Sequence, residues 1–407
     1  MMRYHTIAPD AFDSLSRVTA DPEVAAFLRK VRLSRTLLLI RHIALSLDDE
    51  PAVAALAAAQ TADAAAFERV MAYPWVGVWA ARYVRSSADD GDRAHLSAVA
   101  GAAALRAGVP EAVPLLSVRP GGTIALPTLG AFVGERHPRR VAPADLTGTS
   151  WLPVRHVRLP CTDGGEWALA TDDVDPYRDC HGSAAAERLD GPTWDTWTEM
   201  LRRAWDVIAE HTPLRALEIE AGLSAVTPLS SSGSRGGDSA TNGDAFGGFA
   251  MSLVDDPYSV AATMIHEFQH SRLNALTDLV TLVDGTSADL YFAPWRRDAR
   301  PLEALIHGIF AFIAVAQMWQ AVRHVPTVEE AATRHFALIR AQLSRAARPL
   351  PLASGLTAAG RRLVAGLAAA VEELADHDVP PAVHRDAVRA VDAAEHRLST
   401  TQVRLPA

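Results

Sequence analysis

Apolar residues recur every three or four positions through roughly the first hundred residues, which predicts helices rather than strands. The stretch 21–47, DPEVAAFLRKVRLSRTLLLIRHIALSL, has this spacing, and it opens with Asp21 as the expected N-cap and Pro22 in the first turn. The alanine-rich sequence that follows continues the pattern. We therefore expect an N-terminal helical region over residues 1–110.

The pattern changes after residue 110, where short β-branched runs alternate with Pro-Gly, Gly-Gly and Asp-Gly-Gly turns. This predicts a β-rich segment over residues 111–255. Within it, the spacing over 193–212 predicts a helix, and the alternation over 216–229 predicts a strand. A final strand, over 245–253, is expected to form the edge of a cleft and to lead directly into the next helix.

Helical spacing returns at DDPYSVAATMIHEFQH, where Asp256 is the expected N-cap and Pro257 the first helical residue. A second apolar helix is expected over 301–322, and we group both as a catalytic pair of helices over residues 256–325. The remaining residues, 326–407, form an expected C-terminal helical region that opens with a capping box at Thr327 and Glu330. The fold class predicted from these patterns is α+β, mostly helical.

Composition narrows the possible partners and the cellular location. The formal net charge of -9 argues against a general nucleic-acid binder. No run reaches eighteen uncharged apolar residues, and the N-terminus lacks the apolar core of a signal peptide, so neither a membrane span nor export is expected. Two cysteines are too few for a disulfide framework or a zinc ribbon. We expect a cytoplasmic protein with no membrane or nucleic-acid partner.

The candidate chemistry lies in TMIHEFQHSRLNALTD, which holds the motif His-Glu-x-x-His at His266, Glu267 and His270. Residues four apart share one helix face, so both imidazoles could bind a single metal ion. The helix is otherwise largely apolar, and buried polar groups need partners. We therefore predict a zincin-like metal-binding helix beside the β-rich segment. The simpler interpretation is a pair of histidines that binds no metal.

The third ligand decides the class of metal site, and the sequence offers several. A metzincin would need Gly and His where this chain has Leu273 and Leu276, so that class is excluded. An aspzincin-like site would take Asp289 from GTSADLY, and a gluzincin-like site would take Glu303 from the following helix. His307 lies on the same face of that helix as Glu303. Three histidines with open coordination positions suit Zn(II) and also Fe(II).

Arginines immediately before this second helix add another clue. The segment APWRRDARP contains Arg296, Arg297 and Arg300. They could form a solvated loop with Asp298 as a local partner. Alternatively, one of them could bind a carboxylate through two parallel hydrogen bonds. A zinc protease has no general need for such a group, although a carboxypeptidase could use one. An oxygenase that uses 2-oxoglutarate must hold the distal carboxylate of its cosubstrate.

With these residues in view, the chain resembles the HExxH-motif peptide-modification proteins encoded with ribosomal peptide (RiPP) natural-product clusters. The resemblance extends over nearly the whole chain. It is carried by LSRTLLLIR near the start, LPTLG at 126–130, DDVDPYRD at 172–179, SATNGDAFGGFAMSL, HEFQHSRLNALTDL, YFAPWRRDARP and HGIFAF. As a set, these segments are far more specific than the metal motif alone.

The resemblance implies a 2-oxoglutarate-dependent dioxygenase that hydroxylates a side chain, often at the β-carbon, of a ribosomally synthesised precursor peptide. Its cofactor would be Fe(II), with 2-oxoglutarate and O2 as cosubstrates. The implied iron ligands are His266, His270 and His307. Arg296 and Arg300 match the family pattern as candidate anchors for 2-oxoglutarate, whereas Arg297 does not.

Glu267 takes a different role in each enzyme class. In the hydroxylase it would orient a metal ligand or a metal-bound water molecule. In the alternative, a zinc metallopeptidase, Glu267 would be the general base that activates water beside Zn(II). A third class is a metal-free protein that binds peptides in the same pathway. The hydroxylase is the function that we expect.

Overall fold

The computed structural model describes residues 5–86, 89–230 and 237–402, so the ends of the predicted terminal regions, 1–4 and 403–407, lie outside it. The chain forms two compact units, each built from stretches that are separated in sequence. Unit 1 comprises residues 1–24, 204–219 and 261–407, and unit 2 comprises residues 25–203 and 220–260.

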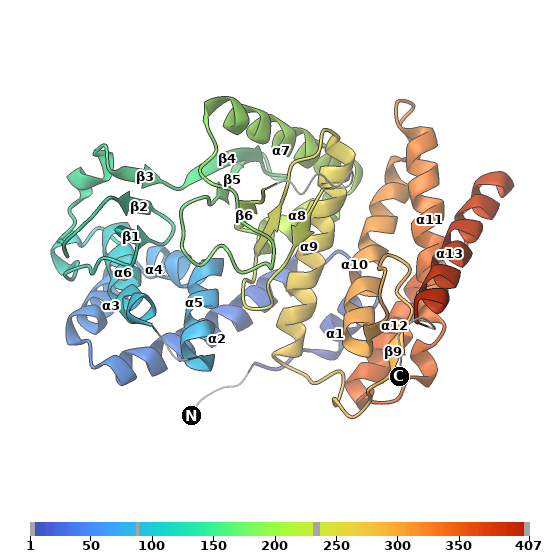
Figure 1. Ribbon diagram of the computed structural model, residues 1–407, viewed down its shortest axis with the longest axis horizontal. Coiled ribbons are helices and arrows are strands. Elements are labelled where there is room, and N and C mark those ends of the chain that lie inside the picture. The colour runs from blue at the N-terminus through green and yellow to red at the C-terminus, as the bar shows by residue number, and fades with distance from the viewer. Residues whose placement is uncertain (1–4, 87–88, 231–236, 403–407) are drawn as a thin grey trace. The chain divides into compact units, whose positions relative to one another are not determined.

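The fold is mostly helical with several small sheets, as the predicted α+β class requires (Figure 1). The α-helices are α1 (Pro9–Ser16), α2 (Pro22–Leu47), α3 (Glu50–Ala62), α4 (Ala64–Met71), α5 (Pro74–Arg85), α6 (Asp90–Arg106), α7 (Gly191–His211), α8 (Pro213–Gly222), α9 (Pro257–Thr277), α10 (Leu302–Ala321), α11 (Glu329–Ala347), α12 (Ala358–Ala375) and α13 (Pro381–Gln402). The strands are β1 (Thr123–Leu126), β2 (Gly130–Val133), β3 (Trp151–Pro153), β4 (Arg155–Pro160), β5 (Glu166–Thr171), β6 (Ala225–Pro228), β7 (Ser239–Ala240), β8 (Gly248–Met251), β9 (Leu290–Tyr291) and β10 (Arg300–Pro301).

Unit 2 contains the two larger sheets. One is a five-stranded mixed sheet in the order β4-β5-β6-β8-β7, with β5, β6 and β8 parallel to one another and the outer strands antiparallel to their neighbours. The other is the antiparallel sheet β1-β2-β3. All four residues of β8 are buried, and the short β7 occupies the edge beside it. The strand expected over 245–253 is present as β8, which is an interior strand of the sheet with β7 at the sheet edge. Its expected place at the edge of a cleft stays a prediction.

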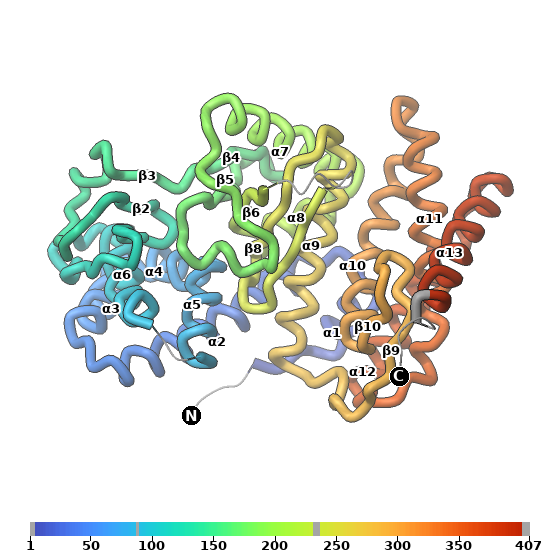
Figure 2. The backbone as a smooth tube through the Cα atoms, viewed as in Figure 1, coloured from blue at the N-terminus to red at the C-terminus, as the bar shows by residue number. Residues whose placement is uncertain are grey.

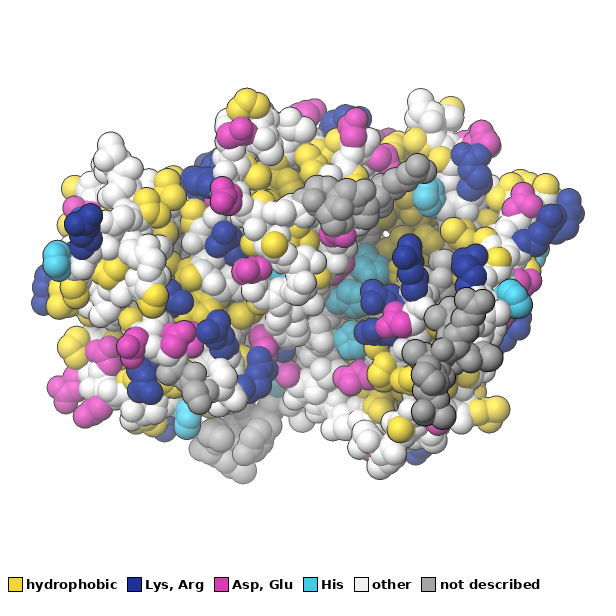
Figure 3. Space-filling model, in the orientation of Figure 1, with side chains coloured by type: hydrophobic (Ala, Val, Ile, Leu, Met, Phe, Trp, Pro, Cys, Tyr) yellow, Lys and Arg dark blue, Asp and Glu magenta, His cyan; other side chains and the backbone are white. Residues whose placement is uncertain are grey.

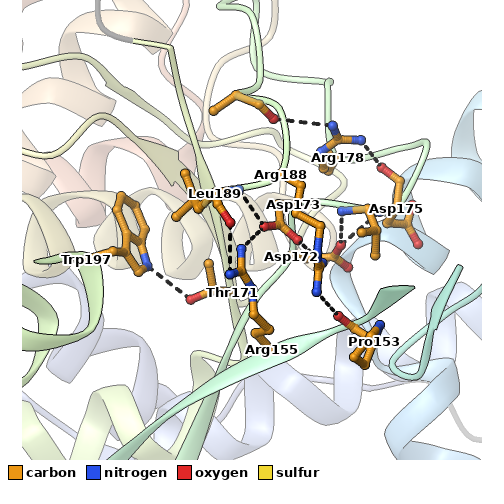
Figure 4. A network of polar contacts seen from close by, with 12 residues as sticks. Pro153, Arg155, Thr171, Asp172, Asp173, Asp175, Arg178, Arg188, Leu189 and Trp197 are labelled. Atoms are coloured by element: carbon orange, nitrogen blue, oxygen red, sulfur yellow. Dashed lines mark hydrogen bonds and ion pairs between the residues drawn. The ribbon is translucent and has the colours of Figure 1, made fainter. Parts of the chain in front are cut away.

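A buried polar cluster follows β5, and we call its members, Asp172, Asp173 and Asp175, the aspartate cluster (Figure 4). The side chain of Asp173 is fully buried and forms ion pairs with Arg155 and Arg188. It also accepts a hydrogen bond from the backbone N–H of residue 189 at 3.2 Å. The carboxylate of Asp173 thus has partners within the chain, as a buried charge requires.

The side chains of the other two aspartates accept hydrogen bonds from backbone N–H groups two or three residues further along the chain. Asp172 accepts hydrogen bonds from the N–H groups of residues 174 and 175, at 3.0 and 2.8 Å, and from the hydroxyl of Tyr73 at 2.5 Å. Asp175 accepts one from the N–H of Tyr177 at 2.8 Å. Burial and the charge of Asp172 raise the pKa of Asp175 to about 8. Burial also raises the pKa of Asp172.

Unit 1 is a helical layer in which α10 packs against α11 and α12, while α11 also packs against α12 and α13. Helix α1 lies against α12. Between α9 and α10 the chain forms a small antiparallel pair, β9 and β10 (Figure 2). In this pair Arg300 lies opposite Tyr291. The loop that carries the arginines is therefore closed at its base, directly before α10.

Helix α10 is apolar almost throughout. The stretch Leu302–His324 is long and apolar enough to cross a membrane by length and composition, but 72% of its most apolar window is buried inside the protein. Its neighbours α11 and α12 cover this surface. A helix in the core of a folded unit has the same composition, because core positions are occupied mainly by apolar side chains.

Two predicted helix starts are confirmed. Asp21 caps α2 by accepting hydrogen bonds from the N–H groups of residues 23 and 24, and Asp256 caps α9 in the same way through residues 258 and 259. The capping box at Thr327 and Glu330 is wrong, because α11 begins one residue later than that box requires and Val328 occupies its N-cap. Glu330 instead pairs with an arginine one turn on.

The strand predicted over 216–229 is wrong in its first half, which belongs to α8, and right in its second half, which is β6. Leu217, Glu218 and Ile219 alternate between apolar and charged residues, as in a half-exposed strand. Glu218, however, is fully buried and forms ion pairs with two arginines. The alternation predicted that the side chain of Glu218 is exposed to solvent, but its ion pairs with these arginines allow it to be buried.

Candidate metal centre

Helix α9 places His266 and His270 on one face, one turn apart. Their rings lie with centroids 4.7 Å apart and nearly perpendicular, at 87°. The two Nε2 atoms are 3.1 Å apart. Both side chains are only partly buried, so the pair remains accessible on this face of the helix. The motif therefore brings together two nitrogens that point to the same place.

His307 of α10 is the third ring of the group. Its centroid lies 5.7 Å from that of His270, with the planes tilted by 33°. Like the other two, it is partly buried. We call His266, His270 and His307 the histidine cluster. Figure 3 shows histidine side chains gathered over α9 and α10, with Lys and Arg side chains beside them.

Aromatic side chains enclose the histidine cluster on one side. Phe312 contacts His266 edge-on, with centroids 4.7 Å apart. Trp295, from the arginine-bearing loop, packs against Phe312 at 4.8 Å. A Cβ at Gly308 would lie 2.4 Å from the Trp295 ring, so only glycine leaves room for the indole on α10. Gly308, the residue after His307, thus allows the Trp295 ring to pack against α10.

Burial lowers the pKa of each imidazole in the histidine cluster, to about 4 for His266, about 3 for His270 and about 4 for His307. For His270 the neighbouring His266 adds to the effect, and Glu267 partly opposes it. All three rings are therefore neutral near pH 7. A neutral imidazole is the form that binds a metal ion.

The separation of the histidine nitrogens allows a test of fit. Two nitrogens bound to one ion at about 2.1 Å lie about 3.0 Å apart for a right angle at the ion and about 3.4 Å apart for a tetrahedral one. The 3.1 Å between His266 and His270 falls within this range. A hydrogen bond in which one neutral ring donates to the other explains the same distance. The pair therefore fits a shared ion without requiring one.

A complete ligand set is not formed. In the described part of the chain, no three His, Cys, Asp or Glu side chains are arranged to hold a metal ion. Glu303 is exposed in the first turn of α10, and the exposed Asp289 accepts a hydrogen bond from Ser354 at 2.9 Å. His307, the remaining candidate third ligand, has its ring centroid 5.7 Å from that of His270.

Glu267 differs from the histidines beside it. Its exposed fraction is 3%, whereas His266 and His270 are both partly exposed. Successive residues on a helix point about 100° apart, so the carboxylate leaves the helix on a different side from His266. The acidic residue of the motif is thus held inside the protein.

The arginines have the local partner that the simpler interpretation predicted. Asp298 pairs with Arg300 at 2.9 Å and with Arg296 at 3.3 Å. Hydrogen bonding and charge from Arg300 and Arg296 lower the pKa of Asp298. Arg300 is the less exposed of the two, and its backbone is fixed in β10. Arg297 is exposed and makes no ion pair within the described residues.

A buried ion network on another face of α9 was not predicted from the sequence. Arg272 and Gln269 of α9 contact Glu218 of α8, at 2.8 and 3.2 Å. Arg215 pairs with Glu218 at 2.6 Å and donates to Gln317 of α10 at 2.8 Å. The network therefore joins the two helices that carry the histidine cluster. The sequence contains one sign of this network: Gln269 and Arg272 are polar residues in a largely apolar helix, and the metal motif does not explain them.

Comparison with known proteins adds no identification: neither protein families nor curated protein sequences yield a match to this chain.

Proposed function

We propose that this chain is an Fe(II)- and 2-oxoglutarate-dependent hydroxylase that modifies a side chain, at the β-carbon, of a ribosomally synthesised peptide. The observation that carries the proposal is the meeting of three neutral imidazoles from two helices, with two nitrogens 3.1 Å apart. The resemblance of the segments around these residues to the HExxH peptide-modification proteins supplies the reaction class.

In this proposal His266, His270 and His307 hold the iron. The first two already present their nitrogens at a separation that suits one ion, and the side chain of His307 would turn toward them on binding. When bound, iron chelated by the 2-oxo acid supplies the activation of O2 that hydroxylation of an unactivated carbon requires. Phe312 and Trp295 limit the access of water to that side of the cluster.

Arg300 and Arg296 are the proposed anchors of the far carboxylate of 2-oxoglutarate. Both are positioned by a loop that is closed at β9 and β10, directly before the helix of His307. Binding would exchange Asp298 for the cosubstrate, since a guanidinium pairs with either carboxylate in the same geometry. Arg300 is the stronger candidate because its backbone is fixed in β10.

The competing proposal, a zinc metallopeptidase, assigns Glu267 as the base that activates water. Glu267 has an exposed fraction of 3%, so in a peptidase the metal-bound water would have to reach it inside the protein. The hydroxylase is preferred because the resemblance of the surrounding segments supplies its reaction class.

The test combines the protein with Fe(II), 2-oxoglutarate, O2 and the peptide encoded beside its gene. The expected products are an intact peptide heavier by one or more oxygen atoms, and succinate. Cleavage of the peptide with Zn(II), without O2 and dependent on Glu267, would make the protein a peptidase instead.

The arginines provide a second readout in the same assay. Arg300→Ala is expected to raise the 2-oxoglutarate concentration needed for half-maximal activity about tenfold or more, because a charge-assisted bidentate contact is lost. Arg297→Ala, in the same loop, is the matched control and should leave this requirement unchanged. Equal cosubstrate dependence in both variants would place the anchor elsewhere.

A further inference from the structure

A second feature of unit 1 lies between the arginine-bearing loop and the last helix. Residues 294–297 and residues of α13 line an open pocket of about 680 Å³. Its walls include Trp295 and Leu398 as large apolar groups. This volume lies in the range of pockets that bind drug-sized ligands or segments of chain. We call it the arginine pocket.

All charged residues that line the arginine pocket are arginines, namely Arg296, Arg297 and Arg397. The chain as a whole carries a net charge of -9, so its average composition does not explain this concentration of positive charge. Arg297 makes no ion pair within the described part of the chain, and Arg296 is held only by Asp298 at 3.3 Å. The pocket therefore offers guanidinium groups to an anion.

The shape of the pocket favours an extended anion over a small one. It is much larger than a small dicarboxylate, and the side chain of Arg296 is 55% exposed, so a bound group would remain open to solvent. Trp295 and Leu398 add apolar surface between the charges. We propose that the arginine pocket binds an acidic peptide segment, with carboxylates on Arg297 and Arg397 and apolar side chains against the indole.

Trp295 connects this pocket to the histidine cluster. The same indole that lines the arginine pocket packs against Phe312, which contacts His266. A peptide that is held in the pocket would thus lie along a wall shared with the candidate metal centre. Naming this peptide as the substrate rests on the proposed function; the binding itself requires neither iron nor cosubstrate.

The experiment measures binding alone, in the presence of a chelator. Fluorescence anisotropy reports the dissociation constant of a labelled, glutamate-rich synthetic peptide for the full chain. A sister peptide with every Glu replaced by Gln is the ligand control. The variants are Arg297→Glu and Arg397→Ala, and the matched control is Arg389→Ala, since Arg389 is an exposed arginine of the same helix outside the pocket.

We expect the acidic peptide to bind, the Gln peptide to bind at least tenfold more weakly, and binding to weaken with added salt. Arg297→Glu should weaken binding about tenfold and Arg397→Ala about threefold, while Arg389→Ala matches the wild type. Equal binding of both peptides, an unaffected Arg297→Glu variant, or displacement of the peptide by 2-oxoglutarate alone would overturn the proposal. Because no iron is present, failure of the hydroxylase assay would not alter these results.

Discussion

The aspartate cluster of unit 2 and the histidine cluster of unit 1 each gather three ionisable side chains, but their polar atoms are satisfied differently. The aspartates accept hydrogen bonds and ion pairs from the chain itself, including two arginines on Asp173. The histidines mainly contact one another and Phe312. Buried polar groups that have all their partners within the chain stabilise a fold. Neutral imidazole nitrogens that face one another are instead available to bind an external ligand such as a metal ion.

The largest expected effect is on folding stability in the aspartate cluster. Asp173→Ala leaves Arg155 and Arg188 without their shared partner and should lower the free energy of unfolding by about 3 kcal/mol. Urea denaturation measures the change. Glu166→Ala, which breaks an exposed pair with Arg158, is the control and should change stability by less than about 1 kcal/mol. Equal losses in the two variants would remove the structural role of this cluster.

The next effect concerns the wall of the histidine cluster. Gly308→Ala puts a methyl group into the Trp295 ring and should cost about 1–3 kcal/mol through overpacking, or displace the indole from α10. Thermal unfolding measures the stability. Gly191→Ala adds a Cβ where no heavy atom lies within 4 Å and provides the control. A Gly308→Ala variant as stable as its control, with unchanged near-ultraviolet circular dichroism, would contradict the packing.

A pH titration distinguishes the aspartate cluster further. The folded-state pKa of Asp175 is about 8, above the ordinary value of 3.8, so between these values the folded chain holds a proton that the unfolded chain releases. Its contribution to stability is therefore present at low pH and is lost as the pH rises toward 8, by at most about 1.4 kcal/mol per pH unit.

Asp175→Asn should remove this contribution, so the variant gains stability relative to the wild type as the pH rises from 5 to 8. Urea denaturation at several pH values gives the difference between the two proteins. A difference that stays constant over this range would mean that Asp175 is ionised in the folded protein at every pH measured.

Much of the helical framework could be predicted because it depends on local signals. The N-caps Asp21 and Asp256 satisfy backbone N–H groups within their own first turn, which the sequence displays directly. The start of α11 and the span of α8 could not be predicted in this way. Glu218 can be buried because it forms ion pairs with two arginines, one of which is more than fifty positions away in the sequence. A local sequence pattern cannot predict such a distant partner.

The candidate site was predicted only in part for the same reason. Helical spacing is sufficient to place His266 beside His270, since both lie on one helix. The approach of His307 depends on how α9 and α10 pack, which the network of Arg215, Glu218 and Gln317 helps to fix. That Arg296 and Arg300 share Asp298 was foreseen only as the simpler of two interpretations.

Equilibrium binding of Fe(II) under anaerobic conditions shows whether the histidine cluster holds one divalent metal ion. We expect about one equivalent in the wild type and in His335→Ala, which removes a histidine that stacks on Trp319 away from the cluster. His266→Ala, His270→Ala and His307→Ala should each lose stoichiometric binding while remaining folded. A wild-type protein that binds no metal, or cluster variants that bind as much iron as His335→Ala, would show that these three histidines do not form a metal site.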